Sequence, residues 1–407
     1  MQVRRPPPEN NIQNYYLDKS LFITNQSSYA GEKMKDGLDY QGIQWNTEMK
    51  NITRDLFRKL RVSGYKPLRE FKGNDLVKYP LKKIKEKEPY YTFEKFYKAP
   101  KLSSQKGQSK YSLVAPTKSD LLYPYTDGFV HHSLREFKEN KIFIEPELNP
   151  TSIDFYNNLV ALTTAKGKLV LYNLKDEYLV YNNTVMNGGS SNNNVSMFKQ
   201  NSSLKLACCG NDRSVQIYDI DMNIELTYKE ITGCAVNAAR PSPDGNLLML
   251  LKAQTAVEIL DLRMGKTVIK LFGHEDYGTS GDWHSNGITV ATGNQDCTCR
   301  IWDLRKPKKQ IDILQTRLGS VSTVKYSKTG SYLAISENID YVNIYNADND
   351  YQDMQVIDFF GENAGLCFDG DDGDNLYFAI LLKGHNGIFE YKEKESKIMH
   401  SLSNFMF

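Results

Sequence analysis

The sequence contains no long hydrophobic run. No apolar segment in its 407 residues approaches the roughly 20 residues that a membrane-spanning helix needs. The first residues, Met1 to Pro8, carry two arginines, but no apolar stretch follows them, which is not the pattern of a secretory signal. We therefore expect a cytoplasmic protein, with the nucleus as a second compartment and no membrane partner.

Cysteine is also scarce, with six in the whole chain. Cys208 and Cys209 are adjacent, and Cys297 and Cys299 are separated by one residue, so neither pair has the C-x-x-C spacing of a zinc site. In a chain without a secretion signal, such cysteines are expected to be reduced and buried as small apolar side chains.

The motifs of catalysis and of cofactor binding are absent from the sequence. There is no serine nucleophile motif, no glycine-rich phosphate loop and no H-E-x-x-H. The acidic run from Asp369 to Asp374 lacks the glycine and glutamate positions of a calcium-binding loop, and a plain turn is expected there. We therefore predict no catalytic residues, no metal and no small-molecule cofactor, and a protein that is not an enzyme.

The small net charge of +2 conceals a strong asymmetry. Residues 1–110 hold 23 basic and 12 acidic side chains, whereas the remainder holds 28 basic and 37 acidic ones. Two interpretations stay open for this basic arm. It lies on the acidic body of its own chain, or it contacts an acidic partner or nucleic acid.

What the sequence does contain is a motif of about 30 residues, from Gly273-His274 to Trp302-Asp303, which is typical of one WD40 propeller blade. Its spacing predicts a chain of hydrogen bonds among four buried side chains. Asp296 accepts from the His274 imidazole, the imidazole bonds the Thr292 hydroxyl, and that hydroxyl accepts from the Trp302 indole. Because each buried polar group then has a partner, this tetrad is expected to be structural rather than catalytic.

Weaker copies of this unit recur along the chain. The aromatic residue of the third strand, or its substitute, falls at steps of 42 to 46 residues, at Tyr172, Tyr218, Leu260, Trp302, Tyr345 and Tyr391. WD40 blades repeat about every 40–45 residues. These six units, with a further blade over residues 111–145, predict an all-β, seven-bladed WD40 propeller. Most copies lack the Gly-His pair, so we expect apolar packing to hold those blades.

Residues 1–110 are predicted to form a basic, mostly irregular N-terminal extension. A disordered arm begins it, and a short helix at about 51–63 follows, with Ile52, Leu56 and Leu60 on one apolar edge. Such a short helix is unstable alone, so it should dock on the propeller. A polar linker leads to the propeller, which is predicted to span residues 111–407, with a surface loop inserted at residues 182–194.

Two stretches together resemble a plant and fungal family of uncharacterised transducin/WD40-like proteins. One is LDYQGIQWN with NITRDLFRKLR and YKPLREF, between Leu38 and Phe71, and the other is the blade from Leu271 to Arg305. The chain is also similar to a yeast substrate receptor of the GID/CTLH ubiquitin ligase. That resemblance implies a receptor, within a multi-subunit complex, that selects proteins through their N-terminal residue.

A propeller places the turns between second and third strands, and the links between blades, on one face. Rigid sheets that present variable loops suit the recognition of proteins and peptides. We therefore predict a protein-interaction scaffold or adaptor, with a ubiquitin-ligase substrate receptor as the narrower hypothesis, because a terminal ammonium needs acidic acceptors. The candidate partner-binding residues are Glu275, Asp276, Tyr277, Asn294, Gln295, Glu337, Asp340, Glu362 and His385. The alternative is a nuclear or RNA-associated regulatory factor that uses the basic arm, although nucleic acid is the less favoured partner.

Overall fold

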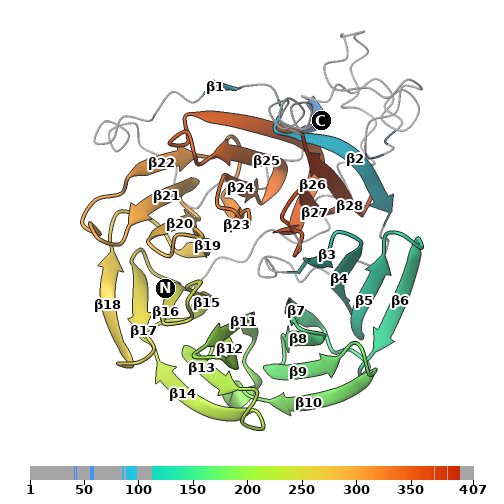
Figure 1. The fold of residues 1–407 in the computed structure, drawn as a ribbon, viewed down its shortest axis with the longest axis vertical. Coiled ribbons are helices and arrows are strands. Elements are labelled where there is room, and N and C mark those ends of the chain that lie inside the picture. The colour runs from blue at the N-terminus through green and yellow to red at the C-terminus, as the bar shows by residue number, and fades with distance from the viewer. Residues whose placement is uncertain are drawn as a thin grey trace, which may run out of the picture.

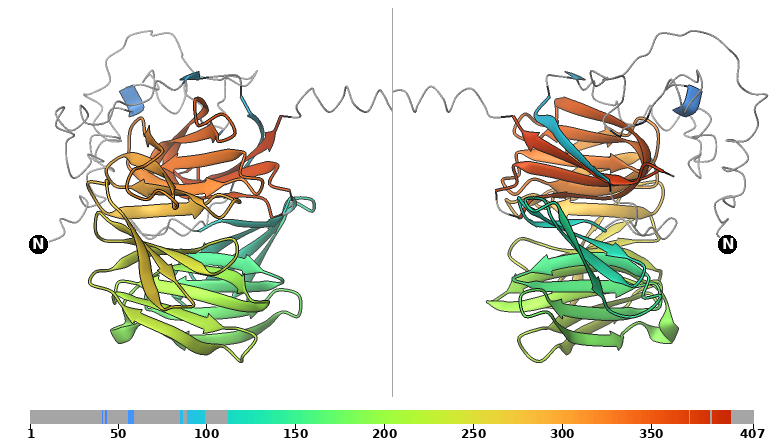
Figure 2. Two further views of the ribbon diagram at one scale, coloured as in Figure 1. Left: turned by 60° about the vertical axis from the view of Figure 1, so that its left-hand side comes forward. Right: turned by 90° about the vertical axis from the view of Figure 1, so that its right-hand side faces the viewer.

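Seven blades form a ring in the computed structural model, and Figure 1 shows their arrangement; five blades are separate four-stranded sheets and two share one larger sheet. The structure describes residues 41, 43, 56–58, 85–86, 89–98, 112–370, 372–382 and 384–394. Seen from the side, the ring is a short cylinder with two faces (Figure 2). The predicted all-β, seven-bladed propeller is confirmed. The predicted disordered arm, the linker and most of the predicted helix lie outside the described residues.

The first three blades each consist of one four-stranded sheet. Blade 1 comprises β3 (Val114–Thr117), β4 (Asp120–Tyr125), β5 (Gly128–Ser133) and β6 (Lys138–Phe143). Blade 2 comprises β7 (Pro150–Tyr156), β8 (Leu159–Thr164), β9 (Lys168–Asn173) and β10 (Tyr178–Thr184). Blade 3 follows the short 3-10 turn η3 (Asn187–Gly189) and comprises β11 (Asn192–Gln200), β12 (Ser203–Gly210), β13 (Ser214–Asp219) and β14 (Glu225–Ile231).

Blades 4 and 5 repeat the same pattern, and blades 6 and 7 share one larger sheet. Blade 4 comprises β15 (Val236–Pro241), β16 (Leu247–Lys252), β17 (Val257–Asp261) and β18 (Lys266–Leu271). Blade 5 comprises β19 (Gly278–Trp283), β20 (Thr289–Asn294), β21 (Thr298–Asp303) and β22 (Asp312–Gln315). The shared sheet contains β23 (Val321–Tyr326), β24 (Tyr332–Glu337), β25 (Ile339–Asn346), β26 (Asp353–Phe368), β27 (Asn375–Leu381) and β28 (Gly387–Glu393).

The local sequence explains why the inner and outer strands differ. A strand covered on both faces must be apolar throughout, and β16 accordingly has the sequence LLMLLK and is buried along most of its length. The outer strand β18 has the sequence KTVIKL, and its burial alternates because only one set of side chains faces the neighbouring blade. The hydrophobic core is consequently divided into clusters that lie between adjacent blades.

An N-terminal strand closes the ring. Strand β2 (Tyr91–Lys98) pairs antiparallel with β28 and becomes the outer strand of blade 7, while β1 (Lys85–Glu86) adds a short parallel pairing to β26. The Gln355 side chain also pairs with the Tyr91 backbone, through bonds of 2.8 and 2.7 Å. The predicted propeller boundary at residue 111 is therefore wrong, since the propeller includes Tyr91–Lys98. The sequence signal for β2 is weak because its partner strand lies some 300 residues away.

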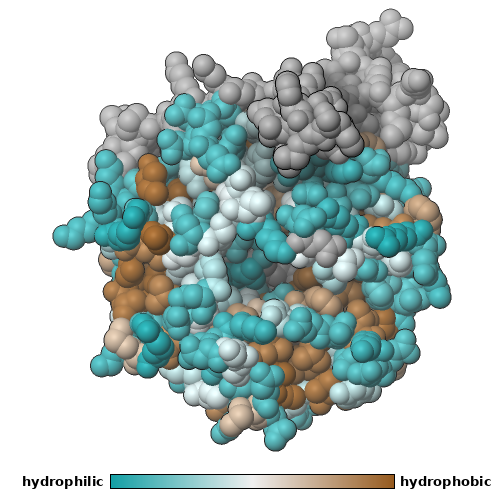
Figure 3. Space-filling model, in the orientation of Figure 1, coloured by the Kyte–Doolittle hydropathy of each residue, from teal (hydrophilic) through white to brown (hydrophobic). Residues whose placement is uncertain are grey.

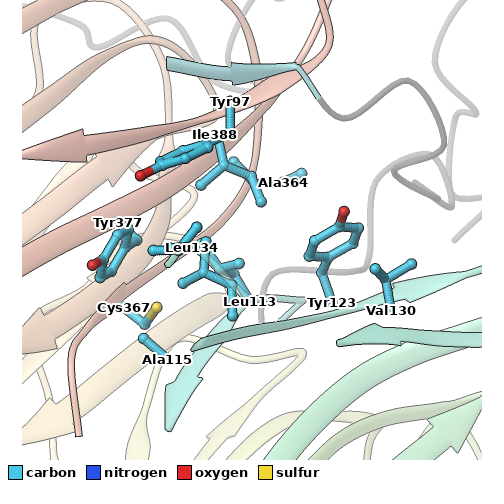
Figure 4. Close-up of a cluster of buried hydrophobic side chains, with 12 residues drawn as sticks. Tyr97, Leu113, Ala115, Tyr123, Val130, Leu134, Ala364, Cys367, Tyr377 and Ile388 are labelled. Carbon is cyan, nitrogen blue, oxygen red and sulfur yellow. The ribbon is translucent and has the colours of Figure 1, made fainter. Parts of the chain in front are cut away.

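Buried side chains seal the junction between blade 7 and blade 1. Figure 4 shows Tyr97 from β2, Tyr377 and Cys367 from blade 7, Leu113 directly before β3, and Tyr123 from β4 of blade 1, all in one cluster. This cluster joins residues from both ends of the described chain, so the ring is closed by packing as well as by strand pairing.

Polar side chains on the innermost strands connect neighbouring blades. Asp154 of blade 2 accepts a hydrogen bond from the backbone N–H of Met197 in blade 3, at 2.7 Å, and Asp282 of blade 5 accepts from the N–H of Tyr326 in blade 6, at 2.9 Å. Asn194 of blade 3 accepts from the Ala239 N–H in blade 4. Residues 192–194 are therefore buried strand residues. The predicted surface loop at 182–194 is wrong at both ends, because residues 182–184 also belong to a strand, β10.

Candidate recognition face

One face of the ring carries the turns between the second and third strands together with the links between blades. Backbone hydrogen bonds connect each turn to the neighbouring link, such as Gln295 N–H to Tyr277 O at 3.1 Å and Asn338 N–H to Ser320 O at 2.9 Å. We call this surface the recognition face. Figure 3 looks along the ring axis at the opposite face, where hydrophilic residues surround a central hollow and apolar residues gather toward the rim.

In blade 5, the turn and the link are fixed by a buried chain of hydrogen bonds. His274 Nδ1 lies 2.9 Å from Asp296 Oδ2, and His274 Nε2 lies 2.9 Å from Thr292 Oγ1. The Trp302 indole N–H donates to the same hydroxyl at 2.8 Å. The bonds follow the order that the spacing predicts, and all four side chains are buried.

Asp296 connects these hydrogen-bonded side chains to the backbone of the link before β19 and of the turn before β21. Its carboxylate also accepts from the N–H groups of Glu275 and Thr298 and from the Thr298 hydroxyl. Burial acts to raise the pKa of Asp296, but the His274 imidazole and these hydrogen bonds outweigh it and lower the pKa to about 2. The carboxylate is therefore charged at neutral pH and holds the link at residues 275–277 in place.

The blade-5 part of the recognition face presents four of the predicted contact residues. Glu275, Asp276, Tyr277 and Gln295 are half-buried and lie beside one another. Asn294 supports them from below, because its buried side-chain amide donates to the Asp276 carbonyl at 2.8 Å. The prediction of Asn294 as an accessible contact residue is therefore wrong, whereas the other four residues are placed where a partner can reach them.

Glu337 is also predicted as an accessible carboxylate, and the structure corrects this. It is fully buried at the end of β24. Its two oxygens accept from the backbone N–H groups of Arg317, Leu318 and Gly319 at 2.7 to 2.8 Å, and from the Asn343 amide at 3.0 Å. Burial raises the pKa of Glu337 even though these donors act to lower it. Glu337 therefore holds the link between blades 5 and 6, where no Gly-His pair is present.

Blade 3 has its own set of hydrogen-bonded side chains in place of the tetrad of blade 5. The Tyr218 hydroxyl donates to Gln216 at 2.7 Å, the Gln216 amide donates to Ser214 at 3.1 Å, and the Ser214 hydroxyl donates to Asp212 at 2.8 Å. The expectation that apolar packing alone holds the atypical blades is therefore wrong for blades 3 and 6. Different side chains connect the same turn and strand there.

Asp340 is likewise fully buried, and a residue of the N-terminal extension covers it. Arg58 Nε donates to Asp340 at 3.1 Å, and the same guanidinium also binds Asp358. This contact agrees with the interpretation in which the basic arm lies on the acidic body of its own chain. The predicted apolar edge of the helix is wrong at Leu56, which is 39% exposed, because the neighbouring Phe57 is the residue that packs on the propeller.

The remaining predicted residues, Glu362 and His385, lie at the blade-7 end of the recognition face and are half-buried. Glu362 is in β26 opposite Leu381, and the His385 N–H donates to the Leu382 carbonyl at 2.7 Å. The structure therefore leaves two accessible groups of predicted residues. One is in blade 5, and the other is in blade 7.

The acidic run near Asp369 forms the turn between β26 and β27. The Asp369 carboxylate accepts from the N–H groups of Asp372, Gly373 and Asn375, which makes it the organiser of the turn. Within the described ranges, no cluster of three or more His, Cys, Asp or Glu side chains is arranged to hold a metal ion. In the same ranges, no helix has the length and apolar character needed to span a membrane.

Comparisons with known proteins agree with this geometry. Residues 265–303 match the family model described as WD domain, G-beta repeat. The protein groucho of Drosophila melanogaster is 25% identical over 203 residues, which is 48% of this chain and 27% of groucho. The target of rapamycin complex subunit LST8, from Bos taurus and from Mus musculus, is 23% identical over 153 residues, or 37% of this chain and 47% of LST8. The chain thus aligns with less than half of each of these relatives.

A solved structure shows the same fold. A chain in the crystal structure of the mitotic checkpoint complex superimposes with a TM-score of 0.63 at 12% identity, over 78% of this chain and 98% of that one. The protein described here therefore carries a WD40 repeat and folds as a WD40 propeller.

Sequence reasoning missed the residues that receive the arm, which are Asp358, Phe359 and Phe360. They lie within the 16-residue strand β26, directly before Gly361, and not in the loop that the sequence predicts as the link between blades. A Phe-Phe-Gly triplet beside an acid, next to an expected link, is the only sequence feature that could have pointed to this position.

Proposed function

We propose that this protein is a non-enzymatic interaction scaffold that binds other proteins on its recognition face and works within a multi-subunit complex. The observation that supports this most is the rigid support beneath accessible polar side chains. In blade 5, the His274–Asp296 pair and the Asn294 amide fix the loops that present Glu275, Asp276, Tyr277 and Gln295. A preorganised surface loses little conformational entropy when a partner binds.

The named relatives support the same proposal. LST8 is described as a subunit of the target of rapamycin complex, and the matched solved chain comes from a complex. We propose that the protein acts in the cytoplasm and also in the nucleus. The contact of Arg58 with Asp340 supports a protein-binding role over nucleic-acid binding, because this cation is already paired within the chain.

Charge reversal on the recognition face tests the scaffold proposal. Asp276→Lys is compared with Asp348→Lys, which changes an exposed turn between third and fourth strands on the opposite face. Partners co-purified with each variant are quantified by mass spectrometry. We expect Asp276→Lys to lose partners that Asp348→Lys keeps. An unchanged partner set for Asp276→Lys, in folded protein, would count against this face.

The narrower proposal is a substrate receptor of a GID/CTLH-type ubiquitin ligase that recognises protein N-termini. A chain-terminal ammonium needs carboxylate acceptors, and Glu275, Asp276 and Glu362 are the accessible candidates, since Glu337 and Asp340 are buried. Fluorescence anisotropy with one peptide sequence, in free and N-acetylated forms, tests this. We expect the free amine to bind more tightly and Glu275→Gln to reduce the difference. Equal binding of the two forms would exclude ammonium recognition.

A further inference from the structure

Near blade 6, the recognition face holds a pocket that binds an arginine together with an aromatic side chain. We propose that this pocket recognises a phenylalanine–arginine pair on a partner protein, and that Phe57 and Arg58 of the same chain occupy it until such a partner competes. The inference rests on the proposed function, because it assigns partner chemistry to one part of the same face.

The guanidinium of Arg58 is bound on every side. Its Nε donates to Asp340 Oδ2 at 3.1 Å, Nη1 donates to Asp358 Oδ2 at 3.2 Å, and Nη2 donates both to Asp358 Oδ1 and to the Phe359 carbonyl. The group also lies over two aromatic rings, 4.7 Å from the Tyr341 centroid and 4.8 Å from that of Phe360. Two carboxylates, a carbonyl and two ring faces suit a planar cation and suit an ammonium less well.

The second half of the pocket is apolar. The Phe57 ring meets the Phe360 ring edge to face, with centroids 5.3 Å apart, and Ile43 and Leu382 complete a small buried cluster. Beside it, the Gln41 amide makes two hydrogen bonds to the Phe360 backbone, both of 2.6 Å. The extension therefore binds through two separate pieces, around residues 41–43 and 56–58.

The pocket is built by the propeller and not by its occupant. Asp340 is the second residue of β25, directly after the tight turn, has a positive φ of 66°, and accepts the Gly361 N–H at 3.1 Å through its other oxygen. This bond fixes the carboxylate from the propeller side. Asp340 and Phe360 are both fully buried while Phe57 and Arg58 are in place. Taking the Arg58 guanidinium away from a buried carboxylate would be unfavourable, so this position favours a cationic side chain.

The chain supplies one such ligand at high local concentration. Thirty-two residues join Arg58 to Tyr91, the first residue of the closing strand β2. A ligand in the same chain binds intramolecularly, so its effective concentration is set by the linker and not by the amount of protein present. A partner with the same Phe-Arg pair must therefore compete with the chain itself, and weakening the internal contact should raise the apparent affinity for an external one.

The experiment uses the full-length protein and a fluorescent peptide of residues 38–63 as the external ligand, with fluorescence anisotropy as the readout. The double variant Phe57→Ala/Arg58→Ala should bind this peptide at least tenfold more tightly than the unmodified chain. A peptide that carries the same two alanines should bind at least tenfold more weakly to the double variant. Asp358→Lys, added to the double variant, should abolish binding. Asp358 suits this substitution because its side chain is 42% exposed, so the folded propeller tolerates the change.

Equal affinity of the peptide for the unmodified chain and the double variant would overturn the proposal, as would binding that Asp358→Lys leaves unchanged. Circular dichroism confirms that each variant is folded. If Asp358→Lys unfolds, Asp358→Asn replaces it, with an expected loss of at least fivefold. Failure of this proposal can be distinguished from failure of the proposed function. The proposed function is tested by the loss of partners in Asp276→Lys, and that substitution lies in blade 5 and leaves this pocket intact.

Discussion

Replacing Thr292 with valine should destabilise the propeller through the hydrogen bonds of blade 5. The Thr292 hydroxyl is the shared partner of His274 Nε2, at 2.9 Å, and of the Trp302 indole N–H, at 2.8 Å. Valine has almost the same shape, so the substitution removes these two hydrogen bonds, and the longer contact of 3.4 Å to the Arg300 carbonyl, without opening a cavity. The indole N–H and His274 Nε2 both lose the hydroxyl as their partner.

The size of the effect follows from the buried donor that remains. A buried polar group that loses its hydrogen bond costs about 1–3 kcal/mol. The indole and the threonine are both fully buried, so water cannot replace the hydroxyl. We expect Thr292→Val to lower the free energy of unfolding by about 2 kcal/mol. Thr292→Ser keeps the hydroxyl and loses only one methyl group, which costs about 1 kcal/mol.

A double-mutant cycle isolates the hydrogen bond. Urea unfolding followed by circular dichroism is measured for Thr292→Val, for Trp302→Phe and for the two together. Because phenylalanine has no N–H, Thr292→Val should cost about 1 kcal/mol less in the Trp302→Phe background. If Thr292→Val costs less than about 0.5 kcal/mol, or the two changes are additive, the hydrogen-bond chain does not stabilise blade 5 in the way described.

Three further predictions concern other buried groups. The pKa of Asp296 is lowered to about 2, so the charged carboxylate stabilises the fold fully above its ordinary pKa, and this stabilisation is lost as pH falls. The difference in unfolding free energy between the unmodified chain and Asp296→Asn should therefore shrink by about 1 kcal/mol from pH 5 to pH 3. An unchanged difference would contradict the lowered pKa. Glu337→Gln places an NH₂ group against backbone donors and should lower the free energy of unfolding, measured in urea, by about 2 kcal/mol. The control Glu362→Gln changes a half-buried side chain and should alter that free energy by less than about 0.5 kcal/mol. Equal effects of the two changes would argue against the role of Glu337 as a buried acceptor. Within the described part of the chain, the buried Tyr91 hydroxyl has no hydrogen-bond partner. Tyr91→Phe should therefore leave thermal unfolding unchanged, whereas Tyr91→Ala should lower stability by about 3–5 kcal/mol. A large loss of stability in Tyr91→Phe would show that the hydroxyl does have a stabilising partner.

The ring of blades could be predicted because its signals are local and repeated. Third-strand residues such as Tyr218, Trp302 and Tyr345 recur at nearly constant steps, and each falls on the third strand of its blade. The bonding order from His274 to Trp302 could also be written from spacing alone, since each residue type allows one role. Both inferences needed only the order of residues within about 45 positions.

The parts that the sequence does not reveal depend on distant contacts or on the length of a turn. Strand β2 pairs with β28, and nothing near Tyr91 indicates that partner. Glu337 and Asp340 were expected in a loop, but β24 ends at Glu337 and β25 begins at Ile339, so a single residue makes the turn and both carboxylates are buried. Acidic residues near a turn are normally solvated, and only the structure shows which donors cover these two.

The central claim is that partners bind the face formed by the turns between second and third strands and the links between blades. Photo-crosslinking at two positions in one blade tests it most directly. A crosslinking amino acid at Gln295 lies on this face, and one at Asn286 lies in an exposed turn on the opposite face of the same blade. The account predicts that partner proteins crosslink at residue 295 and not at residue 286. Crosslinks at residue 286 alone, or equal crosslinks at both positions, would contradict it.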